Sequence, residues 1–201
     1  MKRIDSYLKR DQKNRRGIAV LWLVIWGSMF MTFFGVVLEI ATVWQAQVEL
    51  NNALDAGALS AVKEWEARRS LYNPGDPGYS TEVPREVGLE YLETNLLASP
   101  IQESLASLDT NYDPGDTPNE NASCSGNFVF GRLTFAGSNT FDAGGSTGNL
   151  AVRSQATVPV KGFWSSLFGV SMFDVSGSSV AYFDIGADRP AIVRVEVYDC
   201  P

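Results

Sequence analysis

The sequence predicts an α+β fold in which one long N-terminal helix packs on a small antiparallel β-sheet. Two features of the spacing of apolar residues indicate this class. Ile18 to Leu38 is a continuous apolar run, and from Ile40 to Trp65 apolar side chains recur at the period of an α-helix, so one helix to about residue 70 is expected, which single glycines weaken without ending. Beyond residue 127 the period changes to two, which is typical of strands that bury one face.

The first half of the predicted helix is apolar enough to cross a membrane. The 21 residues from Ile18 to Leu38 carry no formal charge, and about 20 apolar residues in a helix span the hydrocarbon core of a bilayer. A cleaved signal peptide is the alternative, but its apolar region is normally shorter, about 7–15 residues, and ends at small residues. Here Glu39 follows the run, so we expect an uncleaved anchor.

The distribution of charge predicts the orientation. Residues 1–16 contain seven Lys and Arg against two Asp, a net charge of +5, whereas the chain from Glu39 onward has a net charge of −12. Basic residues beside a membrane helix tend to stay cytoplasmic, where they also contact anionic lipid. We therefore expect a cytoplasmic tail (1–16), a transmembrane helix (17–38), its extracytoplasmic continuation (39–71) and an α+β domain (72–201). The acidic domain argues against nucleic-acid binding.

Beyond the span, the helix is expected to bury one face and to end near residue 71. The apolar residues of that face are Ile40, Val43, Trp44, Leu50, Leu54, Ala58, Ala61, Val62 and Trp65. Prolines and glycines from Asn73 to Gly78 end the helix. A weaker helical pattern covers Pro84 to Leu97, and a short helical turn is expected from Ile101 to Leu108.

Four strands are predicted after a polar loop from Asn111 to Asn127. They cover Asn127 to Phe135, Leu150 to Val160, Met172 to Ile185 and Ile192 to Val197. In the second strand, one face is formed by Leu150, Val152, Ser154, Ala156, Val158 and Val160. The apolar segment Phe163 to Phe168 lies between the second and third strands, and the sequence leaves open whether it packs inward or touches the membrane.

The two cysteines, Cys124 and Cys200, both fall on the side of the membrane that is expected to be oxidising, so a disulfide bond between them is predicted. Closing so long a loop would stabilise the domain by about 4 kcal/mol in the chain-entropy model. Two unrelated thiols are the alternative.

Catalysis and metal binding receive little support. The chain has no histidine, which excludes Ser-His-Asp and Cys-His catalysis and His-ligated zinc, and we expect neither an enzyme nor a cofactor. A weak calcium candidate is formed by Asp109, Asn111, Asp113 and Glu120, which have the spacing of an EF-hand loop. Because Pro114 occupies the position that needs glycine, a plain Asx or Pro turn is favoured over a metal site.

The order of motifs resembles a known family. Arg16-Gly17, the apolar span and the segment Gln47 to Leu59 (QVELNNALDAGAL) are similar to the TadE/TadG-like proteins of tight-adherence (Flp) pilus assembly. Phe130-Gly131-Arg132, Ala151-Val152-Arg153 and Val175 to Ala181 follow in the family's order. The resemblance implies a pilin-like helix-on-sheet fold, an inner-membrane location with a periplasmic domain, and contacts with other pilus or envelope proteins or with further copies of the chain.

The same resemblance bears on processing. Pilins and TadE-type pseudopilins are cut after a glycine that follows basic residues, and Gly17, followed by Ile18, has that position. The fifth residue after Gly17 is Trp22, where those proteins carry Glu. The uncut, anchored form is therefore expected. A cleaved pseudopilin that enters a filament is the first alternative, and a membrane-tethered binding module or hydrolase with an acidic or calcium-dependent site is the second.

Overall fold

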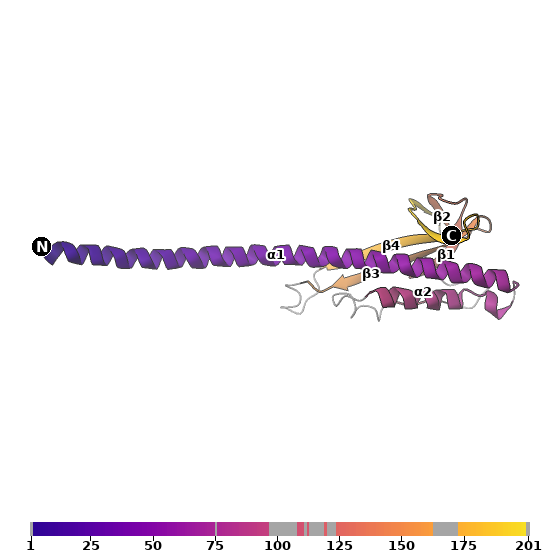
Figure 1. The fold of residues 1–201 in the computed structure, drawn as a ribbon, viewed down its shortest axis with the longest axis horizontal. Helices are drawn as coiled ribbons and strands as arrows, with labels where there is room; N and C mark the ends of the chain where they lie inside the picture. The colour runs from indigo at the N-terminus through magenta and orange to yellow at the C-terminus, as the bar shows by residue number, and fades with distance from the viewer. Residues whose placement is uncertain are drawn as a thin grey trace.

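The computed structural model describes residues 2–74, 76–96, 108–110, 112, 119, 124–162 and 173–199, with the side chains of the first helix from residue 17 onward. It confirms an α+β fold: a long helix lies along a curled sheet, and a second helix packs beside it (Figure 1). The elements are α1 (Lys2–Leu71), the 3-10 turn η1 (Pro77–Tyr79), α2 (Glu82–Asn95), β1 (Phe128–Leu133), β2 (Thr140–Asp142), β3 (Asn149–Val160), β4 (Phe173–Asp184), β5 (Arg189–Val193) and β6 (Val197–Asp199).

The second half of α1 forms the centre of the main core. Its buried side chains are Ala46, Leu50, Ala53, Leu54, Ala58, Ala61, Val62 and Trp65, so the predicted face is confirmed from Leu50 onward. The prediction is wrong at Ile40 and Trp44, which are 64% and 73% exposed. The sheet meets this part of the helix along Glu39, Ala46 and Leu50, a neighbouring stripe of the same helix.

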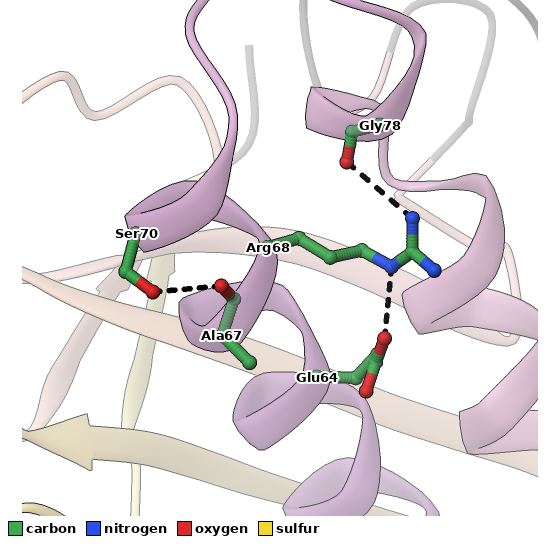
Figure 2. A network of polar contacts seen from close by, with 5 residues as sticks. All are labelled: Glu64, Ala67, Arg68, Ser70 and Gly78. Atoms are coloured by element: carbon green, nitrogen blue, oxygen red, sulfur yellow. Dashed lines mark hydrogen bonds and ion pairs between the residues drawn. The ribbon is translucent and has the colours of Figure 1, made fainter.

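The end of α1 is held by short polar contacts (Figure 2). Arg68 Nε donates to Glu64 Oε1 at 2.8 Å within the helix, and Arg68 also reaches the carbonyl of Gly78 in η1 at 3.5 Å. Ser70 Oγ donates to the Ala67 carbonyl at 2.7 Å and so satisfies a terminal acceptor. These contacts tie the turn after α1 back onto the helix, as expected for the Pro- and Gly-rich boundary.

Two glycines let α2 approach α1 closely. A Cβ atom on Gly88 would lie 2.8 Å from Phe128 Cε1 and 3.0 Å from Ala61 Cβ, and a Cβ on Gly57 would lie 3.0 Å from the Gly88 carbonyl oxygen. The buried face of α2 comprises Pro84, Arg85, Gly88 and Leu92. Tyr91, which the sequence placed in the apolar pattern of this helix, is exposed.

The sheet is mixed rather than antiparallel, which corrects the sequence prediction. Its strand order is β5-β4-β3-β1-β2-β6, and every neighbouring pair is antiparallel except β2 and β6, which are parallel. The predicted strand Ile192 to Val197 is in fact divided between β5 and β6, and β2 was not predicted. β2 has only three residues, which is too short for an alternating pattern to identify it.

A short connection forces the sheet to curl. β5 and β6 lie at opposite ends of the strand order, yet only residues 194–196 join them. Four residue steps reach about 14 Å, whereas five interstrand steps in a flat sheet cover about 24 Å. Tyr198 of β6 accordingly lies under the guanidinium of Arg153 on β3, 3.8 Å from the ring centroid. A second, smaller core fills the curl: Val129, Leu133, Phe141, Ala151 and Val180.

The face of β3 toward α1 is the one that the sequence predicted. Its alternating residues from Leu150 to Val160 are all buried, and the inward Ser154 is satisfied because its hydroxyl donates to the Leu54 carbonyl at 2.7 Å. In β1, which lies within the predicted strand Asn127 to Phe135, the apolar residues do not share one face. Phe128 and Phe130 face the helices, but Leu133 belongs to the core inside the curl, and Phe135 is exposed beyond the strand end.

A buried arginine joins the loop after α2 to the sheet. Arg85 is 1% exposed and donates to the carbonyls of Phe128 at 2.7 Å and Thr110 at 3.0 Å. Burial lowers the pKa of Arg85 to about 10, so the side chain is still charged at neutral pH. Asn119 continues this network by bonding to Phe130 of β1 and to the Ala143 carbonyl after β2.

The two chain segments that carry the cysteines converge on β3. Gln155 Nε2 donates to the carbonyls of Cys124 at 2.5 Å and Gly126 at 2.9 Å. Tyr198, two residues before Cys200, stacks on Arg153 of the same strand. Cys200 itself lies outside the described residues, as do residues 101–107 of the predicted turn and the apolar segment 163–168. The disulfide bond therefore stays a prediction.

Replacement of Gly88 tests the close approach of the helices. Gly88→Ala should lower the free energy of unfolding by about 1–3 kcal/mol, because the added methyl group overlaps Phe128 and Ala61 and outweighs the gain in helix propensity. Thermal unfolding of the full chain in detergent, followed by near-ultraviolet circular dichroism, measures this. Glu86→Ala on the exposed face of α2 is the matched control and should change little. An equally stable Gly88→Ala variant would contradict the packing.

Replacement of the cysteines tests the bond. Cys124→Ser and Cys200→Ser should each lower stability by about 4 kcal/mol, and the double variant should lose no more than either single one, because both remove the same bond. Thiol titration of the unfolded, unreduced protein should find no free thiol. Two free thiols, or additive losses, would show that the cysteines are unrelated.

Candidate membrane and assembly interface

The segment of α1 from Ile18 to Val37 is an apolar rod that the domain does not cover. Every large apolar side chain from Ile18 to Val37 is exposed, and α1 is the one helix among the described residues that is long and apolar enough to cross a membrane. Trp22, Trp26 and Phe30 follow one another along one side of the helix, with ring centroids 6.4 Å and 6.2 Å apart. Figure 1 shows the N-terminal part of α1, which includes this segment, projecting away from the domain.

The hydroxyl groups on this rod are satisfied within the helix. Ser28 Oγ donates to the Ile25 carbonyl, Thr32 Oγ1 to the Ser28 carbonyl and Thr42 Oγ1 to the Leu38 carbonyl, each at 2.9 Å. A polar group in hydrocarbon is costly unless it is hydrogen-bonded. The rod therefore meets the main chemical requirement for a helix surrounded by lipid.

Glu39 marks the point where the domain first meets the rod. The sequence placed this carboxylate at the outer edge of the span, in reach of headgroups or water. The structure instead buries it to 6% exposure against the end of β3, where a side chain on Gly162 would overlap the carboxylate. Residues 39 and 160–162, far apart in the sequence, thus meet where the exposed segment of α1 enters the domain.

An apolar stripe continues past Glu39 on the opposite side of α1. Val37, Ile40, Trp44 and Val48 are exposed and lie within one arc at 100° per residue. Asn51 and Asp55 occupy the same arc one and two turns later, so the stripe ends at Val48. The sequence assigned Ile40 and Trp44 to the packed face. The small residues Ala46, Ala53 and Gly57 on the neighbouring arc were the available signal of where the domain packs closely.

The predicted calcium ligands are not brought together by anything that the structure describes. The backbone N–H of Asp109 donates to Asn127 Oδ1 at 3.0 Å, while Asn111, Asp113 and Glu120 lie outside the described residues. Elsewhere in the described part of the chain, no group of three or more Asp, Glu or Cys side chains is placed to hold a metal ion. Calcium binding stays a prediction with the plain turn as the favoured alternative.

A shallow polar groove lies across β3 and β4. It encloses about 580 Å³ and is lined by Arg153, Gln155, Thr157, Ser176 and Ser178 among others, with no carboxylate in its lining. Burial lowers the pKa of Arg153, the groove's only cation. An acidic hydrolytic cleft needs converging carboxylates, so this groove gives no support to the hydrolase alternative.

Comparison with known proteins adds no relative. No protein-family model, no curated protein and no solved structure matches the chain. The functional interpretation therefore rests on the sequence resemblance and on three features of α1: its exposed apolar segment, the buried Glu39 and the exposed stripe that ends at Val48.

Proposed function

We propose that the chain is a single-pass membrane protein that acts through protein-protein contacts in pilus or surface-appendage assembly, as the TadE/TadG-like resemblance implies. Its N-terminus lies in the cytoplasm and its domain in the periplasm, on the outer side of the cytoplasmic membrane. The observation that carries the membrane part is the exposed apolar segment of α1, which continues without a break into the helix at the centre of the core.

The magnitude of the exposed apolar surface supports an anchor. Fifteen large apolar side chains between Ile18 and Val37 are exposed. At roughly 1.5–3 kcal/mol for each buried side chain, their transfer out of water is worth on the order of tens of kcal/mol. That exceeds the net stability of a typical domain, about 5–15 kcal/mol, so a helix of this kind needs a permanent apolar surrounding.

The assembly part rests on the ordered sequence motifs and on the shape of the molecule. A basic tail, an apolar span and a helix that enters a compact sheet domain are the parts that the family combines. The absence of histidine from the sequence and the lack of a carboxylate in the described groove favour contacts over catalysis. The partners that we propose are membrane lipid, other envelope or pilus assembly proteins, and further copies of the chain.

A cleaved filament subunit is the second candidate. Gly17 stands at the start of the exposed apolar helix with no atom within 4 Å of an added Cβ, so nothing in the described chain covers the bond to Ile18. A filament would cover the bare helix with neighbouring subunits. Trp22 in place of Glu argues for the anchored form.

Topology and intact mass separate the two. In membranes from the native cell, the protein should have the mass of the uncut chain, with or without Met1, and should resist carbonate extraction. Protease added to spheroplasts should remove the domain, because it lies outside, and leave a fragment of the tail and span. A chain beginning at Ile18 would assign the protein to a filament, and a protected domain would reverse the orientation.

Loss of the gene tests the role in assembly. Deletion in the source bacterium should reduce surface filaments seen by electron microscopy, and the full chain should restore them. A variant with Leu23→Lys and Ile25→Lys should fail, because charges at the centre of a span oppose insertion by about 2.5–3.5 kcal/mol each. The matched variant with Glu90→Lys and Glu93→Lys on α2 should restore filaments. Unchanged filaments in the deletion strain would refute the assembly role.

A further inference from the structure

The domain and the apolar surface of α1 overlap along the helix. On one side, the domain covers α1 from Glu39 upward, because Glu39 lies against Gly162 and Ala46 is buried. The border of this side is marked by Gln47, whose Nε2 donates to the Ser176 carbonyl of β4 at 2.9 Å. On the other side, the exposed apolar stripe persists through Ile40 and Trp44 to Val48. The overlap from Glu39 to Val48 is about 14 Å long at the rise of an α-helix.

A domain held above the membrane on a stalk would leave this stripe in water. The stripe is continuous with the bare rod, since Val37 precedes Ile40 on the same arc, and it ends where Asn51 and Asp55 begin. A surface that continues the lipid-facing surface without interruption has lipid as its simplest occupant.

Helix length agrees with this occupant. From Gly17 to Trp44, α1 rises by about 40 Å, and a bilayer with its headgroups is about 40–45 Å thick. Trp44 then lies at the outer interface, where tryptophan is favoured because its ring is apolar and its N–H is polar. Glu39 lies about 8 Å deeper. It is the one carboxylate of α1 between Gly17 and Trp44, and it is the residue that the domain shields.

We propose that the outer headgroup layer covers Ile40, Trp44 and Val48 and also receives the membrane-side ends of β3 and β4, so that the domain sits on the bilayer. This inference rests on the proposed membrane anchoring. One described residue at that end has the required chemistry. Phe173, which pairs with Val160 across β3 and β4, is 45% exposed, and an aromatic ring is favoured at the membrane interface.

Photocrosslinking from single positions tests whether the domain lies on the bilayer. p-Benzoylphenylalanine is introduced into the full chain as Trp44→p-benzoylphenylalanine or Phe173→p-benzoylphenylalanine, and the protein is reconstituted in phosphatidylcholine-phosphatidylglycerol vesicles. The exposed residues Phe30, within the span, and Leu71, at the far end of α1, serve as matched positions. After irradiation, mass spectrometry should find one added phospholipid from positions 44 and 173 at a yield near that of position 30, and only background from position 71.

Each other outcome would contradict the proposed contact between the domain and the bilayer, and the outcomes can be told apart. Covalent dimers from position 44 would assign the stripe to a second copy of the chain. Background yield at position 173, with lipid adducts at position 30, would show a domain that stands clear of the bilayer while the anchor holds. Background yield at position 30 as well would refute the membrane anchoring itself.

Discussion

The structure depends on α1 being one unbroken helix, of which one segment is exposed and another is buried in the core of the domain. Its segment from Ile18 to Val37 is exposed, its segment from Ala46 to Trp65 is the centre of the core, and neither proline nor a loop separates them. A flexible linker would allow the domain to take any depth and rotation relative to the exposed segment. A continuous helix allows one rotation only, because each residue turns the helix by a fixed 100°. The arc that carries Glu39, Ala46 and Leu50 therefore decides which side of the rod the domain occupies.

The connection between β5 and β6 is the second constraint, and it shapes the surface that remains for contacts. Three residues join β5 and β6, which lie at opposite ends of the strand order. The part of the sheet near these two strands must therefore close on itself around Val129, Phe141 and Val180. Closure removes much of the apolar face that would otherwise need a cover. β3 from Arg153 to Thr157 and the paired part of β4 lie outside this closure. Their polar residues, such as Gln155, Thr157 and Ser176, line the groove. On the face away from α1, this part of β3 and β4 is thus polar and accessible.

Sequence reasoning identified the elements with long, regular patterns and missed those that depend on tertiary contacts. α1 and β3 were predicted because their apolar periods extend over many residues. The stripe through Ile40 and Trp44 was misassigned because a period shows that a face is apolar without showing what covers it, lipid or protein. β2 and the parallel β6 exist through pairing with distant strands. Arg85 gave no signal at all, since a buried arginine is recognisable only when its acceptors, the carbonyls of Thr110 and Phe128, are seen around it.

In the proposed membrane position, these constraints together fix how deep the chain lies in the bilayer. A shift of α1 outward by one turn, about 5.4 Å, would draw the apolar side chains at its outer end, such as Ile40 and Trp44, out of lipid and pull Arg15 and Arg16 toward the hydrocarbon. An inward shift would press the end of β3, with the carboxylate of Glu39 beside it, deeper into the bilayer, where polar groups are costly. Because the same stiff helix forms both the proposed span and the centre of the core, the costs of an outward and of an inward shift also oppose any movement of the domain relative to the bilayer. An assembly partner that moved the span would have to move the sheet with it, and this coupling follows from the unbroken α1 alone.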